Sequence, residues 1–212
     1  EINMPRIRGI LSTVQVQSGA LVTNIFAGTD TRLVKLDAGS NKFQEFNYAN
    51  SSAADPTYSN VVRWRFQEFA TTGSGARVVY AASGVGQALQ KFDSNGSTAP
   101  TSVSGAPNAT HVAAVGRFLV CANTSNSEAE VVWSAIDDAS AWTNGTDQSG
   151  AQILADTSEI TGLIGGETGL IFTRTGIYRM NYLGPPLVFG FEKVSNQGCE
   201  FAGSTAARSS NE

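Results

Sequence analysis

The sequence predicts an all-β protein built from repeated antiparallel strand units, arranged like the blades of a β-propeller. Three observations lead to this expectation. Apolar stretches are short, rich in Val, Ile, Phe, Tyr and Thr, and separated by Gly, Asn and Ser. Helical periodicity is almost absent. One layout of strands and glycine turns recurs four times along the 212 residues.

Two kinds of strand can be recognised by their side-chain pattern. Residues 14–17 and 63–67 alternate polar and apolar side chains, as strands with one buried face do. In contrast, residues 117–122 are almost continuously apolar, which is typical of a strand buried on both faces. We therefore expect Phe118–Ala122 to form a central, buried strand.

In the alternating stretch 63–67, the two apolar side chains and the two arginines lie on opposite faces. Trp64 and Phe66 are expected in the core. Arg63 and Arg65 then form the strongest local basic spot of the chain. Two charges give only a weak, salt-sensitive contact with nucleic acid.

The repeat is marked by four anchor glycines, Gly19, Gly75, Gly116 and Gly169. They lie roughly 40–55 residues apart, which is the period of propeller blades. A strand is expected to enter the third and fourth anchors, over 110–115 and 160–164. In the first repeat, Gly28 is expected to form the next turn. A β-sandwich with accidentally similar hairpins remains the alternative, because the spacing is irregular.

Polar segments at 50–59, 94–108 and 143–150 separate the repeats. They are rich in Ser, Thr, Asn, Gly and Pro, and the strand pattern resumes unchanged after each one. We interpret them as surface loops and expect residues 1–212 to form a single propeller-like domain.

Charge narrows the classes of partner. The formal net charge is −4, only 15% of residues are charged, and no cluster contains five or six basic residues. This composition argues against tight nucleic-acid binding. No apolar run is long enough to span a bilayer, so membrane insertion by this chain is not expected. A surface poor in charge suits close packing between many copies, because charged side chains are costly to desolvate.

No catalytic or cofactor site is expected. The single histidine, His111, lies in a predicted strand without a partner pattern for nucleophilic catalysis, so a structural role is favoured. Metal binding would need Cys and His at close spacing, which are missing. No glycine-rich segment ends in Lys-Ser or Lys-Thr, so a phosphate loop is not expected. Cys121 and Cys199 are expected to be unpaired, because a lone pair of distant cysteines does not make a disulfide framework.

Carboxylates and tryptophans are the remaining candidates for a site. Acidic residues gather at positions 137, 138, 147, 156 and 159, and two carboxylates suffice for glycoside hydrolysis. In loops such residues more often cap turns. Trp133 and Trp142 bracket the same corner, where packing under the loop is favoured over stacking on a sugar. Trp133, Trp142, Asp137 and Asp138 are therefore the candidate ligand or interface contacts.

A series of motifs begins at this corner with a strand ending in Trp133-Ser134, an acidic turn and a second tryptophan at Trp142. It continues through 160–164 and 169–180, then Gly198-Cys199, Ser204 and Arg208-Ser209. In this order the motifs resemble those of tail nozzle, or packaged-DNA stabilisation, proteins of short-tailed bacteriophages. The similarity covers residues 112–209 well and the first hundred residues loosely.

The resemblance implies a propeller-like structural virion protein, made in the host cytoplasm and assembled into the phage tail. It implies a homo-oligomeric ring around the DNA exit channel, in contact with other tail proteins such as an adaptor, fibres or a needle. Members of that family normally continue with further strands, so the resemblance also implies a fragment of a longer chain or a relative with fewer blades. DNA would pass through the ring during ejection without being held tightly.

Two other functions stay open. One is a carbohydrate- or receptor-binding propeller of a phage tail, which would use Trp133, Trp142 and the loop at 143–150. The other is a glycosidase of propeller fold, which would use the acidic residues between 137 and 159.

Overall fold

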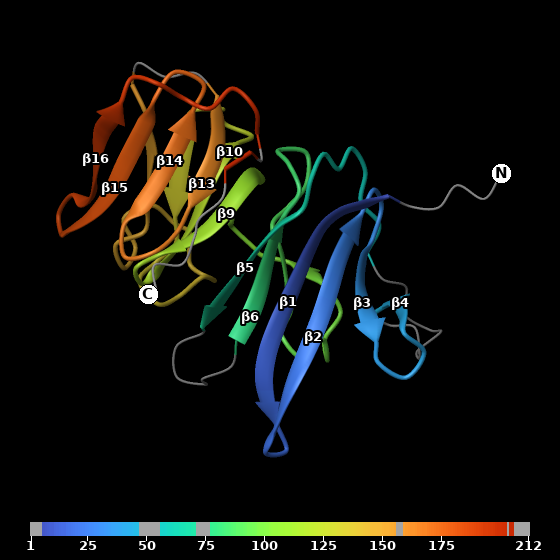
Figure 1. The fold of residues 1–212 in the computed structure, drawn as a ribbon. Helices are drawn as coiled ribbons and strands as arrows, with labels where there is room; N and C mark the ends of the chain where they lie inside the picture. The colour runs from blue at the N-terminus through green and yellow to red at the C-terminus, as the bar shows by residue number, and fades with distance from the viewer. Residues whose placement is uncertain (1–5, 47–55, 71–76, 156–158, 203, 206–212) are drawn as a thin grey trace, which may run out of the picture.

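The computed structural model describes residues 6–46, 56–70, 77–155, 159–202 and 204–205. These residues form strands joined by turns and loops, with the strands in four antiparallel four-stranded sheets (Figure 1). The prediction of an all-β chain made of repeated strand units is confirmed. In the described segments, no helix has the length and apolarity that a membrane span requires.

Each sheet is a meander in which the strands lie side by side in chain order. The first sheet contains β1 (Ile7–Gln17), β2 (Ala20–Thr29), β3 (Leu33–Asp37) and β4 (Lys42–Glu45). The second contains β5 (Arg65–Ala70), β6 (Arg77–Ala82), β7 (Gln90–Asp93) and β8 (Thr101–Ser102). The third contains β9 (Ala109–Val115), β10 (Phe118–Thr124), β11 (Glu130–Trp133) and β12 (Gly150–Ile153). The fourth contains β13 (Ile160–Ile164), β14 (Gly169–Thr173), β15 (Ile177–Gly184) and β16 (Val188–Ser195).

The four sheets follow one another as the blades of a propeller do. The first strands of successive sheets contact each other, β1 with β5, β5 with β9 and β9 with β13. The first sheet and the fourth lie at opposite ends of the resulting row (Figure 1). The described residues therefore form an open, propeller-like arc, and the β-sandwich alternative, which needs two facing sheets, does not apply.

Three hydrophobic clusters fill the three spaces between successive sheets. The first cluster contains Phe26 and Phe92, from the first and second sheets, with Trp64 from the connection between them. The second lies between the second and third sheets, and the third between the third and fourth sheets. Both faces of the two inner sheets are thus covered by apolar residues of a neighbouring sheet, which explains the continuous apolar run predicted for a central strand.

Strand β10 is that central strand. It lies between β9 and β11, and every residue from Phe118 to Thr124 is buried. Phe118 and Val120 belong to the cluster shared with the fourth sheet, whereas Leu119 and Cys121 belong to the cluster shared with the second sheet. The prediction that Phe118–Ala122 is central and buried on both faces is confirmed.

The three described anchor glycines lie at the first hairpin of the first, third and fourth sheets. Gly19 lies in the β1–β2 turn with a φ of 82°, and Gly116 lies in the β9–β10 turn with a φ of 55°. Both values favour glycine, because a Cβ is strained there. Gly169 is the first residue of β14. Gly75 lies outside the described residues.

Gly28 does not form a turn, as the sequence suggested, but lies inside β2. A Cβ at this position would come within 2.0 Å of Cδ1 of Trp64. The glycine is required because the indole ring packs directly against the backbone of β2. The Nε1–H of Trp64 donates to the carbonyl of Thr29 at 2.8 Å, which fixes the ring there.

In three of the sheets the second strand ends at a threonine, and the hydroxyl of this threonine accepts a hydrogen bond from a backbone N–H of the following turn. The Oγ1 of Thr29 accepts a hydrogen bond from the backbone N–H of Arg32 at 2.9 Å. Thr173 makes the same bond with Gly176 at 2.9 Å, and Thr124 with Ser127 at 3.4 Å. In the second sheet Ser83 directly follows β6, and its buried Oγ has no partner among the described residues. The same position in three sheets thus carries a turn-capping threonine, which is a further mark of the repeat.

Candidate functional site

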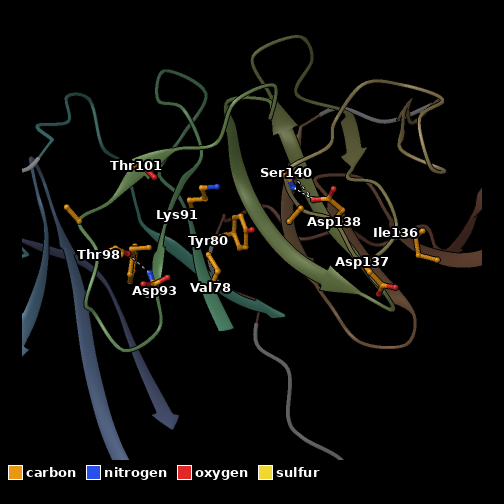
Figure 2. Close-up of a pocket in the computed structure, with 13 residues that line it drawn as sticks. Val78, Tyr80, Lys91, Asp93, Thr98, Thr101, Ile136, Asp137, Asp138 and Ser140 are labelled. Carbon is orange, nitrogen blue, oxygen red and sulfur yellow. Dashed lines mark hydrogen bonds between the residues drawn. The ribbon is translucent and has the colours of Figure 1, made fainter. Parts of the chain in front are cut away.

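A cleft lies between the second sheet and the turn at 136–140 that follows β11 of the third sheet (Figure 2). We call it the inter-sheet cleft. Its volume is about 760 Å³, which is in the range of pockets that bind small molecules. Val78, Tyr80, Lys91 and Thr101 line it from the second sheet, and Asp138 and Ser140 from the third.

Strand register places the polar residues of the second sheet in one row. Tyr80 pairs with Lys91 across β6 and β7, and Lys91 pairs with Thr101 across β7 and β8. Directly paired residues of antiparallel strands carry their side chains on the same face of the sheet. Since the Tyr80 ring belongs to the cluster shared with the third sheet, the whole row faces that sheet.

Tyr80 is held rigidly at the floor of the inter-sheet cleft. Its side chain is only 2% exposed, and its ring meets Phe69 in an edge-on contact at 6.5 Å between centroids. Among the described residues its hydroxyl has no hydrogen-bond partner, and it points from the second sheet toward the third (Figure 2). Burial, together with the negative charge of Asp138, raises the pKa of Tyr80 to about 12. The phenol therefore stays protonated at neutral pH and can donate a hydrogen bond.

The residues that face the next sheet differ between the three interfaces. In the first sheet, Lys35 pairs with Phe26 as Lys91 pairs with Tyr80. The Nζ of Lys35 donates to the carbonyl of Gly96 in the second sheet at 2.8 Å and lies 5.6 Å from the Phe46 ring centroid. Lys35 thus links the first sheet to the loop between β7 and β8 of the second. In contrast, Lys91 has no hydrogen bond or ion pair with any described residue, and it lines the inter-sheet cleft.

At the third interface the corresponding position is occupied by a tryptophan. Trp133 pairs with Val120 across β11 and β10, and its ring packs against Phe189 at 5.2 Å between centroids. Its Nε1–H donates to the carbonyl of Gln148 at 2.8 Å. One sheet position is thus filled by a bonded lysine, by an unbonded lysine or by an indole, and the inter-sheet cleft lies where the lysine is unbonded.

The two candidate tryptophans are core residues. Trp133 is 5% exposed and Trp142 is 8% exposed. Trp142 belongs to the cluster between the second and third sheets, and its Nε1–H donates to the carbonyl of Ala139 at 2.8 Å. Both rings pack beneath the loops that follow β11, the arrangement that the sequence analysis favoured over stacking on a sugar.

The two candidate aspartates have different environments. Asp137 forms an ion pair with Arg117, with 2.9 Å between Nε and Oδ1, and adopts a φ of 57°. Asp138 accepts hydrogen bonds from the backbone N–H and the hydroxyl of Ser140, at 2.8 and 2.6 Å. The second arrangement is a turn cap of the kind expected for acidic residues in loops. Asp138 is exposed and faces the inter-sheet cleft.

The other described acidic residues of this segment are Glu159 and Asp147. Glu159 forms an ion pair with Arg174 at 2.6 Å, next to the fourth sheet. Asp147 adopts a φ of 45° in the loop before β12. Asp156 lies outside the described residues. In the part of the chain that the structure describes, no group of three or more His, Cys, Asp or Glu is placed to hold a metal ion.

The single histidine connects three sheets. His111 on β9 is fully buried, and its Nδ1 accepts a hydrogen bond from Nε of Arg65 on β5 at 2.8 Å. Its Nε2 lies 3.2 Å from the carbonyl of Ile160 on β13. Arg65 is therefore not a surface basic spot with Arg63, as the sequence suggested, but a partly buried cation that joins the inner strands. Burial lowers the pKa of Arg65 to about 10.

A second surface of interest is the face of the first sheet that points away from the second sheet. We call it the first-sheet face and define it by Ile10, Val14, Val16 and Leu21, which are 57–77% exposed. The neighbouring residue Thr13 points the other way, and its hydroxyl donates to the carbonyl of Ser94 in the second sheet. The first sheet is thus apolar on both sides, but only one side is covered by the described residues.

Tyr80 and Lys91 could not be recognised as site residues from the sequence, because their proximity depends on strand register, which no local motif encodes. No protein-family model matches the chain, and a search of curated proteins found no significant match.

Proposed function

We propose that this chain is a structural protein of a short-tailed bacteriophage tail, of the nozzle or packaged-DNA stabilisation type. In this proposal identical subunits form a ring around the channel through which DNA leaves the particle. The order of the resembling motifs between residues 112 and 209 supports the family, and the propeller-like arrangement of sheets agrees with it. Other tail proteins, such as an adaptor, fibres or a needle, would contact the ring.

The observation that carries the assembly proposal is the first-sheet face. Its four apolar side chains lie on one face of β1 and β2, where Val16 follows Val14 on that face and pairs with Leu21, and Ile10 lies further along β1. Burying an aliphatic side chain of this size is worth about 1.5–3 kcal/mol. Each internal interface of the chain buries an equivalent sheet face, so a sheet of a neighbouring subunit is a suitable partner for this one.

A contact between this face and a different surface of the next copy is heterologous. Such contacts close into rings when the rotation between copies permits it and otherwise form filaments. A ring at a fixed position in a particle satisfies this condition, because the structure on which it assembles sets the number of copies. The first-sheet face therefore fits a ring better than a two-fold dimer, in which the same patch would meet itself.

The charges support a channel that does not hold DNA. The chain has a formal net charge of −4. Several arginines are already engaged with carboxylates: Arg8, Arg32, Arg77, Arg117, Arg174 and Arg179. A phosphate would have to compete with these partners, and tight DNA binding normally uses many free basic side chains. DNA would then slide past the ring.

Light scattering of the purified protein, alone and with the tail adaptor, tests this proposal. We expect a multimer that Val14→Asp disrupts, because this change places a charge in the first-sheet face. Val62→Asp is the matched control, since Val62 is 73% exposed but lies outside that face. A monomer under both conditions, or equal effects of the two variants, would contradict ring assembly through this surface. Sub-micromolar DNA binding at physiological salt in a gel shift would contradict the sliding channel.

A further inference from the structure

The inter-sheet cleft combines donors and acceptors that the protein leaves available. Tyr80 and Lys91 contribute a phenol and an ammonium group without partners among the described residues. Asp138 faces them from the third sheet and uses one carboxylate oxygen for the cap on Ser140. Val78 and Ala139 add apolar surface. The hydroxyl of Tyr80 is open to the cleft, so water or a ligand there can accept its hydrogen bond.

The charges of the cleft select the class of ligand. The cleft presents charges of both signs, the ammonium group of Lys91 and the carboxylates of Asp93, Asp137 and Asp138, and the excess of carboxylates disfavours an anion such as a phosphate. A neutral molecule with several hydroxyl groups can accept from Tyr80 and Lys91 and donate to the carboxylates at the same time. An apolar C–H face on the same molecule can pack against Val78. Pyranose sugars have both properties.

We propose that the inter-sheet cleft binds one neutral hexopyranose unit of a glycan. Tyr80 and Lys91 donate hydrogen bonds to the sugar oxygens from the second sheet, and Asp138 accepts from its hydroxyl groups on the opposite side. The volume of about 760 Å³ accommodates one sugar ring with room for the adjoining units of a chain at the open side.

This site is separate from the surface used in the ring proposal. The cleft lies between the second and third sheets, whereas the first-sheet face lies on the far side of the first sheet. Sugar binding therefore needs no ring, and a failure of either proposal leaves the other standing. The site also differs from the one first considered at Trp133 and Trp142, whose rings are buried.

Saturation-transfer NMR and calorimetry with simple sugars test the proposal. The probes are the methyl glycosides of glucose, galactose and mannose, together with N-acetylglucosamine and methyl glucuronide. We expect at least one neutral sugar to bind saturably, with millimolar affinity. The anionic glucuronide should bind more weakly than methyl glucoside, because it places a carboxylate near Asp93 and Asp138.

Two pairs of variants locate the site. Tyr80→Phe removes only the hydroxyl, and Tyr182→Phe is its control, because the hydroxyl of Tyr182 donates to Gln148 away from the cleft. Lys91→Met removes the ammonium group, and Lys42→Met, on the exposed β4, is its control. We expect affinity to fall about five-fold or more in each cleft variant and to stay unchanged in the controls.

Two outcomes would overturn the proposal. One is the absence of saturable binding for every neutral sugar of the set. The other is binding that survives both Tyr80→Phe and Lys91→Met, because the sugar would then lie elsewhere. Circular-dichroism melts of all four variants distinguish a lost contact from an unfolded protein, and Tyr80→Phe keeps the aromatic ring that packs in the core.

Discussion

The Nε–H of Arg65 donates to Nδ1 of His111 across 2.8 Å, and this bond determines the protonation state of the imidazole. Because Nδ1 accepts, the ring proton lies on Nε2, where it points to the carbonyl of Ile160 at 3.2 Å. A second proton would have to lie on Nδ1, directly against a guanidinium. Burial and the charge of Arg65 accordingly lower the pKa of His111 to about 3.

This bond predicts a pH dependence of folding. The unfolded chain binds a proton at His111 below its ordinary pKa of 6.5, but the folded chain does so only below about 3. Between these values the unfolded state holds more protons, so stability falls as pH falls from 6.5 towards 3. The full effect of this group is as much as about 5 kcal/mol.

Urea melts between pH 3 and pH 7 test this prediction by comparing the protein with His111→Gln. The variant loses hydrogen bonds at neutral pH and is less stable there. Its stability should nevertheless depend less on pH in this window, because the carboxylates that also titrate are common to both proteins. Parallel pH profiles would show that His111 is not the buried neutral group described above.

Phe118→Ala should lower the free energy of unfolding by about 3–5 kcal/mol. Phe118 is 2% exposed, and its ring lies 4.9 Å from that of Phe189 and 5.5 Å from that of Tyr182, between centroids. Phe201→Ala is the control, since Phe201 is 75% exposed. Denaturant melts measure both, and a loss below about 1 kcal/mol for Phe118→Ala would contradict a core position for β10.

Gly28→Ala should destabilise the first sheet. The added methyl group meets the indole of Trp64, and either the ring or β2 must move. Gly86→Ala, in the loop before β7, is the matched control, because no atom lies within 4 Å of the Cβ that it adds. The two variants are compared by thermal melts. If they melted at the same temperature, the packing of Trp64 on β2 would have to be revised.

The two cysteines should differ in reactivity. Both are free in the structure; Cys121 is buried and Cys199 is partly exposed. Burial also raises the pKa of Cys121, so that its reactive thiolate is scarce. Iodoacetamide without reductant should label Cys199 in the native protein and both residues after denaturation, as read by intact mass. Failure to label either residue after denaturation would indicate a disulfide.

The parts of the fold that the sequence predicted are those set by local patterns. The apolar run of β10 requires two covered faces, and the anchor glycines at 19 and 116 require a positive φ. The outermost strands were harder to foresee. β8 is only two residues long and lies within the polar segment 94–108, so hydrophobic alternation could not reveal it.

The inter-sheet cleft depends on information that no local pattern contains. Tyr80 and Lys91 are ten or so positions apart in the sequence, and only the register of β6 and β7 makes them neighbours. The difference between Lys35 and Lys91 depends on the loop that each one meets in the next sheet. Similarly, Arg65 looked like a surface charge because its partner, His111, comes from another sheet.

Electron microscopy of the purified protein, and of its source particle, tests the central claim most directly. The account predicts a closed ring of identical subunits at the tail, with the first-sheet face of each copy covered by its neighbour. A subunit that remains single in both preparations, with Ile10, Val14, Val16 and Leu21 open to solvent, would contradict it.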